Sequence, residues 1–197
     1  MSDALIDAVM HIARRFAPLD RVDFAPVLQS LVVRDLASGE DLLRPGQADP
    51  PEFFVLSGML KTWVADAHGR EATLAFHEGP GIVMPAGTRT QHGCSRVFCS
   101  ALSPTQVAVF APQCLVDCML HNSAVRQWGE AVMHAELLRR ADREWALAAL
   151  TAQERLRALR QEFPGLEDRV ALHHIASYLG MTVVTLSRAR TALRKRS

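Results

Sequence analysis

The sequence predicts an α+β protein that consists of an antiparallel, jelly-roll-like β-roll, a long helix and a C-terminal helix-turn-helix of the winged type. Short apolar runs between turn residues over 31–111 predict the β-roll. A stretch almost without glycine over 123–150 predicts the long helix. Two short helical patterns on either side of Gly180 predict the helix-turn-helix. We therefore divide the chain into 1–122, 123–150 and 151–197.

The composition is that of an ordinary globular chain of one or two domains. Of the 197 residues, 49% are apolar and 22% are charged, which allows a sizeable core and excludes collagen-like, low-complexity and disulfide-scaffold classes. No apolar stretch approaches the ~20 residues that a membrane-spanning helix needs. Asp3, Asp7, Arg14 and Arg15 interrupt the first sixteen residues, which excludes a secretory signal there. We expect a cytoplasmic protein.

Residues 2–30 are expected to be helical, with breaks at Pro18 and Pro26. The β-roll follows, because its apolar runs are short and turn residues separate them. The runs that we expect to be strands include 53–56, 62–64, 73–76, 97–98 and 107–110. Residues 67–70 between two of these runs predict a hairpin, since Gly69 can adopt the positive φ that such turns require.

An apolar stripe follows the long helix at steps of three and four residues, close to the period of a two-helix seam. At ~1.5 Å per residue, this helix would be roughly 40 Å long and must bury the stripe. We assign a homodimer seam to Trp128, Val132, Ala135, Leu138 and Trp145. Packing of the same stripe on the β-roll is the alternative, and Asp142 interrupts the pattern.

A new helix is expected to begin at Thr151, which makes this residue a hinge. Thr151 and Glu154 have the spacing of a capping box, in which each side chain binds the other residue's backbone N–H. Pro164 and Gly165 end the helix.

The segment 170–194 has the pattern of a helix-turn-helix. Its first helix has an apolar face, Gly180 makes the turn, and Thr182 is a candidate N-cap of the second helix. Arginine can bind the O6 and N7 edge of guanine and can also neutralise phosphate. We assign DNA contacts to Thr182, Thr185, Ser187, Arg188, Arg190, Arg194 and Lys195. A generic two-helix corner in an all-α domain is the alternative.

Charge supports a polyanionic partner for this end of the chain. All 21 acidic residues lie at or before Asp168, and residues 1–168 have a net charge of −5. Residues 169–197 carry six basic residues and no acidic one. A basic end on an acidic body predicts binding to double-stranded DNA, whereas a merely solvated basic terminus is the alternative.

The order of β-roll, long helix, hinge and helix-turn-helix resembles the Crp/Fnr superfamily of bacterial transcription regulators. Residues 151–164 and 174–190 carry most of this resemblance, and residues 54–60 resemble the β-roll core of the family. The resemblance implies a cytoplasmic homodimer with a β-roll sensor domain that binds promoter DNA and can contact RNA polymerase. It places Arg188 at the position of the family's base-reading arginine.

The cyclic-nucleotide pocket that the resemblance implies is degenerate here. The family binds the ribose with a Gly-Glu segment, whereas this chain has Met84 or a neighbour at the glutamate position. Arg96 is one residue from the expected phosphate-binding position, and a one-residue shift in a strand turns a side chain to the opposite face. We assign the effector pocket to Met84, Arg96 and Phe98, expect no response to cyclic AMP, and predict no cofactor.

The sequence also differs from the family at two places in the DNA-binding region. Little chain follows the second helix, so we expect little or no β-hairpin wing there. Val183 and Val184 replace polar base-reading residues, which prevents transfer of a target sequence from the family.

Cysteine and histidine residues suggest the alternative functions. Cys94, Cys99, Cys114 and Cys118 are expected to be reduced and structural, although Cys114, Cys118 and His121 have a spacing that suits a metal or redox sensor. A cupin-like metal- or small-molecule-binding β-roll with an incidental basic tail is a further alternative, but its clustered His-x-His pattern is missing. We predict neither a metal site nor enzyme activity, because no catalytic arrangement is recognisable.

Overall fold

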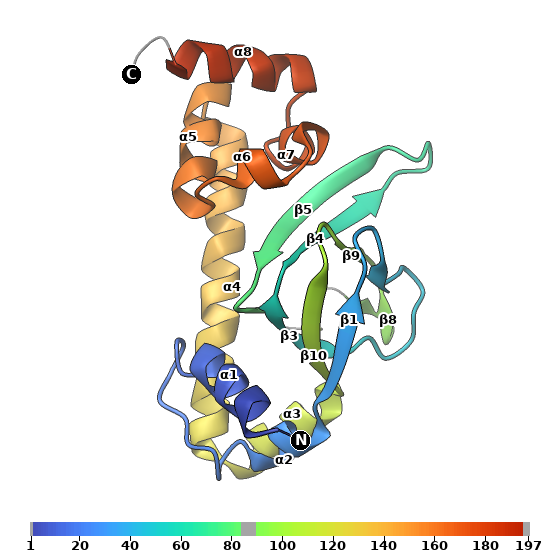
Figure 1. Cartoon of the computed structure of the whole chain (residues 1–197), viewed down its shortest axis with the longest axis vertical. Helices are drawn as coiled ribbons and strands as arrows, with labels where there is room; N and C mark the ends of the chain where they lie inside the picture. Colours follow the sequence, from blue (N-terminus) through green and yellow to red (C-terminus); the bar gives the residue numbers. More distant parts are fainter. Residues whose placement is uncertain (1, 84–89, 195–197) are drawn as a thin grey trace. The chain divides into compact units, whose positions relative to one another are not determined.

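The computed structural model describes residues 2–83 and 90–194 of the chain. These form two compact units. Met1–Thr62 with Phe76–Glu136 is called the N-terminal unit, and Trp63–Ala75 with Leu137–Ser197 is called the C-terminal unit. The model combines helices with antiparallel sheets, so that the predicted α+β class is confirmed (Figure 1). No helix in the described ranges is both long enough and apolar enough to cross a membrane.

The β-roll contains two four-stranded sheets, ordered β1-β10-β3-β6 and β2-β9-β4-β5, and a small β7-β8 ribbon. The first sheet is antiparallel throughout, with Val109 opposite both Val32 and Phe53. The strands are β1 (Val32–Leu36), β2 (Asp41–Leu43), β3 (Glu52–Ser57), β4 (Met59–Ala65), β5 (Glu71–Glu78), β6 (Gly81–Val83), β7 (Thr90–Gln91), β8 (Cys94–Ser95), β9 (Phe98–Ala101) and β10 (Thr105–Phe110). The five runs expected as strands lie in β3, β4, β5, β9 and β10, except that Val97 precedes β9.

Strand β3 is buried on both faces, because it separates two apolar clusters. Phe53 and Val55 point into the core of the roll, with Leu60 and Val107. Phe54 belongs to a second core formed with the surrounding helices. A strand that is covered on both sides has a continuous apolar sequence, as this one has.

Helices cover one side of the roll within the N-terminal unit. They are α1 (Asp3–Ala13), α2 (Ala25–Ser30), α3 (Pro112–His121) and the first turns of α4 (Ser123–Ala149), which Figure 1 shows gathered together. Pro26 was expected to break a helix, but it lies in the first turn of α2, where proline needs no hydrogen-bond acceptor. Helix α3, which precedes the long helix, was not predicted.

Trp128 and Val132 were assigned to a dimer seam, and this part of the prediction is wrong. Both side chains are buried in the helix-covered core of their own unit, and Trp128 is fully buried. The indole Nε1–H of Trp128 donates a hydrogen bond to Ala13 O at 2.8 Å, and its ring lies 5.0 Å from that of Phe24. For the first turns of α4, the packing alternative is therefore correct.

The later turns of α4 behave differently. Leu137, Leu138 and Trp145 are 54%, 52% and 61% exposed, and Ala135 is also exposed. Three of the five assigned seam residues thus remain available to a second chain.

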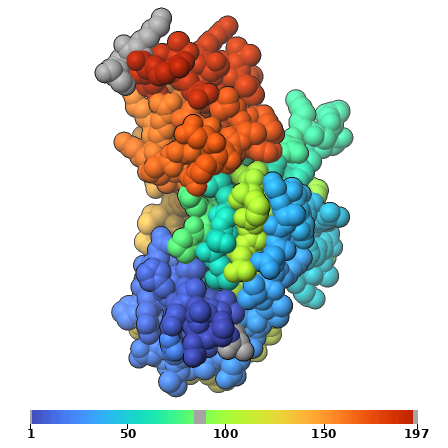
Figure 2. Space-filling view, viewed as in Figure 1, coloured from blue at the N-terminus to red at the C-terminus, as the bar shows by residue number. Residues whose placement is uncertain are grey.

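The C-terminal unit is mainly helical and includes the tip of the β4–β5 hairpin. Its further helices are α5 (Ala152–Glu162), α6 (Leu166–Arg169), α7 (Leu172–Tyr178) and α8 (Val183–Arg194), which form one packed group at the red end of Figure 2. Thr151 and Glu154 form the expected capping box. The hairpin turns at Gly69, which has a φ of +76° as predicted, and the Asp66 carboxylate accepts the backbone N–H of His68 and of Arg70.

We expect Gly58→Ala to destabilise the protein more than Gly39→Ala does. Both glycines have a φ near +85°, so alanine costs about 1–2 kcal/mol at either position. A Cβ at Gly58 would in addition overlap Pro104 O and Thr105, whereas nothing lies within 4 Å of one at Gly39. Overlap with backbone adds about 1–3 kcal/mol. Urea unfolding of both variants measures the difference, and equal losses would contradict the close packing of this turn.

Candidate nucleic-acid interface

Helices α7 and α8 form a two-helix corner with a buried interior. Its apolar side chains are Ile175, Ala176, Leu179, Leu186, Ala189 and Leu193, all at most 6% exposed. Gly180 makes the turn with a φ of +63°, and Met181 N–H donates to Ala176 O at 3.0 Å. The structure therefore contains the helix-turn-helix that the sequence predicts.

Thr182 caps α8, as predicted. Its hydroxyl oxygen accepts the backbone N–H of Thr185 at 3.1 Å, and the two hydroxyl groups lie 2.9 Å apart. This arrangement satisfies one of the N–H groups that a helix start leaves unpaired. Both threonines thus help to form the first turn of α8.

The outer face of α8 presents Ser187, Arg188 and Arg194, all of which are exposed. Val183 and Val184 are exposed beside them, at 44% and 60%. Helix α8 therefore has a surface that carries cations, hydroxyl groups and branched apolar groups. The predicted contact Lys195 lies outside the described residues.

Arg190 differs from its neighbours, because it is bound to its own unit. Its Nε lies 2.8 Å from an oxygen of Glu167, whose side chain is only 13% exposed. The same carboxylate binds Arg160, with an Nε–Oε2 distance of 2.5 Å. Arg190 was predicted to contact DNA like the other arginines of this helix, whereas in the structure it joins α8 to α6.

The corner is also attached to the hairpin tip of the C-terminal unit. Thr73 N–H donates to Ser177 Oγ at 2.9 Å, and the Ser177 hydroxyl donates to Glu71 O at 3.2 Å. Arg143 of α4 donates from Nη2 to Thr73 O and to Tyr178 O, both at 3.0 Å. These contacts were not predicted, because they join the hairpin, α4 and α7, which are far apart in the sequence.

Tyr178 lies at the centre of this attachment. The guanidinium carbon of Arg143 is 4.8 Å from its ring centroid, and its hydroxyl donates to Glu162 at 3.4 Å. Burial raises the pKa of Tyr178 to about 12, and the neighbouring Glu162 carboxylate adds to this shift. Burial also raises the pKa of Glu162 and lowers that of Arg143.

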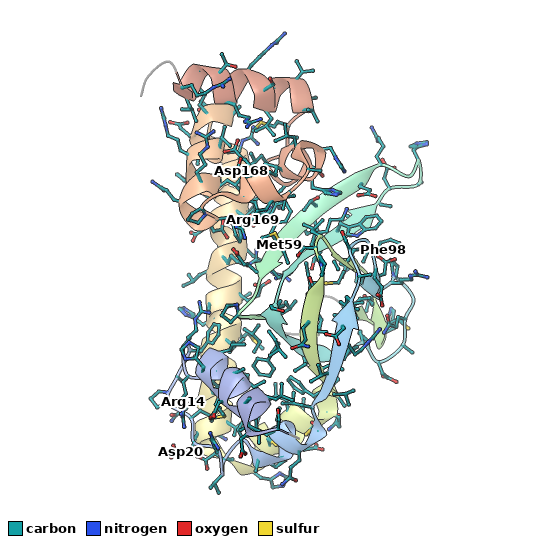
Figure 3. All side chains as sticks on the ribbon, in the orientation of Figure 1. Arg14, Asp20, Met59, Phe98, Asp168 and Arg169 are labelled. Atoms are coloured by element: carbon teal, nitrogen blue, oxygen red, sulfur yellow. The ribbon has the colours of Figure 1, made fainter. Side chains whose placement is uncertain are left out.

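The predicted effector residues are not gathered into a describable pocket. Arg96 is exposed, Phe98 is half-buried at the start of β9 (Figure 3), and Met84 lies outside the described residues. The assignment of these three residues therefore stays a prediction.

The cysteine and histidine residues form no evident metal centre. Within 2–83 and 90–194, no cluster of three potential ligands is suitably placed. All four cysteines are free thiols, and His121 Nδ1 is 2.8 Å from Asp117 O. Burial, with Cys114 adjacent, raises the pKa of the Cys118 thiol, which reduces its thiolate fraction.

Comparisons with known proteins show a similar fold and similarity in sequence to a bacterial transcriptional activator. No family model matches the chain. The chain is 28% identical over 169 residues to the transcriptional activator protein Anr of Pseudomonas protegens, covering 80% of this chain and 68% of Anr.

Solved structures share the fold at low identity. FixK2 of Bradyrhizobium japonicum has a TM-score of 0.72 at 21% identity, covering 84% of this chain and 85% of FixK2. The regulator CLP of Xanthomonas campestris has a TM-score of 0.71 at 16% identity, covering 90% and 93%. A regulator of the Crp/Fnr family from Eubacterium rectale has a TM-score of 0.70 at 15% identity, covering 90% and 85%.

The titration of Tyr178 tests its burial directly, because it is the single tyrosine of the chain. The phenol pKa of about 12, against an ordinary value of 10, means that the folded state retains its proton where the unfolded state loses it. The contribution of the Tyr178 phenol to the free energy of unfolding is therefore complete below pH 10 and is lost as the pH rises toward 12. At pH 11, ultraviolet difference absorbance should show only about a tenth of the phenol ionised, against about nine tenths for an ordinary tyrosine, while circular dichroism still reports folded protein. A midpoint near 10 in the folded state would contradict this environment.

Proposed function

We propose that this chain is a member of the Crp/Fnr superfamily of transcriptional regulators and binds promoter DNA by placing α8 in the major groove. The exposed, basic face of α8 is the observation that supports the proposal most directly. The corner behind this face is fully packed, so the face is held on a rigid element. The cupin-like and redox-sensor alternatives are not favoured, because Anr, CLP and the protein from Eubacterium rectale are regulators by name.

The side chains on α8 suit two kinds of DNA contact. Arg188 and Arg194 are exposed cations that can pair with a guanine edge or neutralise phosphates. Val184 has only methyl groups to offer and suits contact with thymine methyl groups. Arg190 stays bound to Glu167 in this proposal and orients α8 instead of reading a base.

We propose that the active form is a homodimer joined through the later turns of α4. Leu137, Leu138 and Trp145 leave large apolar side chains more than half exposed on one helix. Such a surface is typical of one that a second chain covers. Two-fold symmetry would then present two copies of α8 to half-sites about one helical turn apart.

The proposal extends to the effector and to the other partners of the protein. The ribose-binding carboxylate that the family uses has no counterpart in this sequence, so cyclic AMP is not its effector. RNA polymerase is a partner if the protein activates transcription, as its relative Anr does by name. A protein that acts on promoter DNA in bacteria works in the cytoplasm.

Arg188→Ala tests the DNA-binding role. On a duplex obtained by in vitro selection, the variant should lose about 1–3 kcal/mol of binding free energy and relax the preference for one base pair. Fluorescence anisotropy over a series of salt concentrations measures both affinity and the number of phosphate contacts. Arg34→Ala is the matched control, since Arg34 is an exposed arginine on β1. Equal binding by both variants and the unaltered chain would refute the assignment of α8.

Leu138→Asp tests the dimer. A carboxylate in an apolar seam should shift the protein to the monomer, because burying an unpaired charge is costly. Leu138 is 52% exposed within its own chain, so its replacement should leave the fold intact. Sedimentation velocity measures the mass, with Val22→Asp as a control at another exposed apolar residue. A dimer that survives Leu138→Asp would exclude this face of α4.

A further inference from the structure

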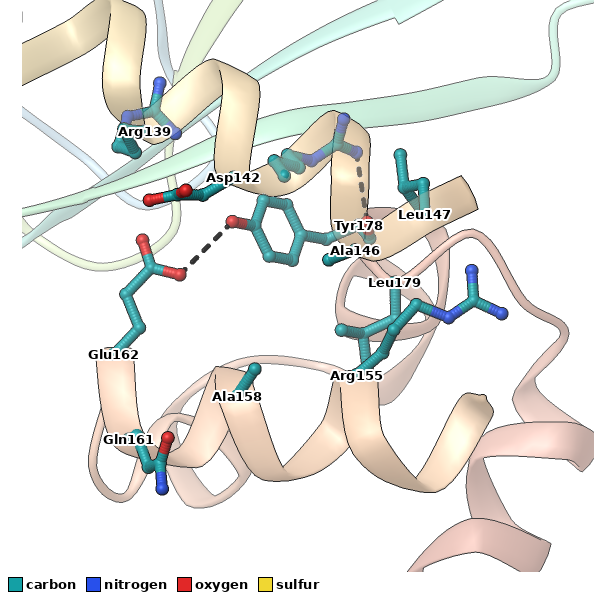
Figure 4. A pocket seen from close by; sticks show the side chains of 11 residues that line it. Arg139, Asp142, Ala146, Leu147, Arg155, Ala158, Gln161, Glu162, Tyr178 and Leu179 are labelled. Atoms are coloured by element: carbon teal, nitrogen blue, oxygen red, sulfur yellow. Dashed lines mark hydrogen bonds between the residues drawn. The ribbon is translucent and has the colours of Figure 1, made fainter. Parts of the chain in front are cut away.

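The C-terminal unit contains a cavity of about 440 Å³ that the proposed function does not use. Side chains from α4, α5 and α7 line it, and Figure 4 shows it between the end of α4 and α5, with Tyr178 projecting between them. This volume lies within the range of small-molecule sites in proteins, which is about 300–1,000 Å³. One of its three walls belongs to the first helix of the helix-turn-helix.

Apolar groups form most of the cavity wall. The ring of Tyr178 stands between Ala146 and Leu147 of α4 and Ala158 of α5, and Leu179 is adjacent. A wall of this kind favours a ligand with a flat apolar body, because such a body displaces water from both faces.

The charged side chains divide the cavity into two ends. Glu162 lies at the hydroxyl end of Tyr178, with its oxygen 3.4 Å from that hydroxyl. Arg143 lies at the backbone end, 3.0 Å from Tyr178 O. Arg155 lies near Gly180, two residues beyond, since its Nη1 would be 3.3 Å from a Cβ at that glycine. The backbone end of Tyr178 is therefore cationic.

The two arginines at the cationic end have unused hydrogen-bond donors. In the part of the chain that the structure describes, neither Arg143 Nε nor Arg155 Nε meets an acceptor, and both are hidden from water. A buried donor without an acceptor is rare in proteins and suggests a missing partner. An anion bound in the cavity would supply an acceptor to these N–H groups. Burial lowers the pKa of Arg143, so an anion beside its guanidinium would offset part of the cost of removing that charge from water.

We propose that this cavity binds a small aromatic carboxylate, with the carboxylate between Arg143 and Arg155 and the aromatic ring against Tyr178 and Leu147. Arginine suits this contact because its N–H groups match the two oxygens of a carboxylate. Asp142 and Glu162 lie at the opposite end of the cavity together with Arg139. Two carboxylates outnumber one guanidinium there, which disfavours an anion bound in the reverse orientation.

A ligand in this cavity touches helix α7, and binding is therefore coupled to the arrangement of α4, α5 and α7. If the ligand changes the affinity for DNA by some factor, DNA changes the affinity for the ligand by the same factor. This coupling rests on the proposed function, whereas binding to the cavity does not.

The single tyrosine makes the cavity directly observable. In the full chain labelled with 3-fluorotyrosine, one ¹⁹F resonance reports on Tyr178 alone. We use benzoate as the probe, with benzamide as its neutral counterpart, benzylamine as a cation, and inorganic phosphate as an anion without a ring. Benzoate should shift the resonance saturably with a dissociation constant on the order of 1 mM. Benzamide, benzylamine and phosphate should each bind at least tenfold more weakly than benzoate, on the order of 10 mM or above.

Two variants locate the site. Arg155→Gln should weaken benzoate binding at least tenfold, whereas Arg157→Gln on the same helix should not, because Arg157 is exposed and does not line the cavity. Ala158→Leu should also weaken binding, because the added side chain fills the cavity. A single sharp ¹⁹F resonance and an unchanged circular dichroism spectrum show that each variant is folded.

Several results would overturn the proposal. An unchanged resonance at ~20 mM benzoate, equal binding of benzamide or benzylamine, or full binding by folded Arg155→Gln would each do so. DNA affinity is measured separately, with and without benzoate. Failure to bind any DNA would refute the proposed function while leaving the cavity result intact, and an unchanged DNA affinity in saturating benzoate would refute the coupling alone.

Discussion

The organisation of the C-terminal unit depends on the contacts of one half-buried guanidinium group, that of Arg143. It donates to a carbonyl of the hairpin tip and to a carbonyl of α7, and it lies over the ring of Tyr178. A charged group removed from water is stable only when its N–H groups find acceptors. Because those acceptors belong to two different segments, Arg143 holds both segments against α4. A change in this contact would alter how the helix-turn-helix is supported.

The arginines of α8 differ in what they bind. Glu167 binds Arg190 and Arg160 together, and so joins α8 to α5 and α6. Arg188 and Arg194 remain exposed. A salt bridge with a partly buried carboxylate is more persistent than one in open water. Arg190 thus orients α8, whereas Arg188 and Arg194 remain accessible to a polyanion.

The long helix also has two tasks, which change along its length. Its first turns bury Trp128 and Val132 against α1 and α2, and its later turns leave Leu138 and Trp145 in solvent. The apolar stripe of α4 keeps the same spacing along the helix but has two different roles. The part covered by its own chain contributes to a core, and the exposed part has the character of an interface.

Local signals in the sequence determined much of the molecule. The capping box at Thr151, the turns at Gly69 and Gly180 and the cap at Thr182 were predictable, because each depends on residues within one turn of the chain. Only the tertiary structure decided that Trp128 lies in a core, that Arg190 binds Glu167 and that Arg143 bridges the hairpin and α7. Periodicity and charge show which face of an element is apolar or basic, but not which other element meets that face. That choice depends on packing between residues far apart in the chain, and the cavity beside Tyr178 exists only as a result of it.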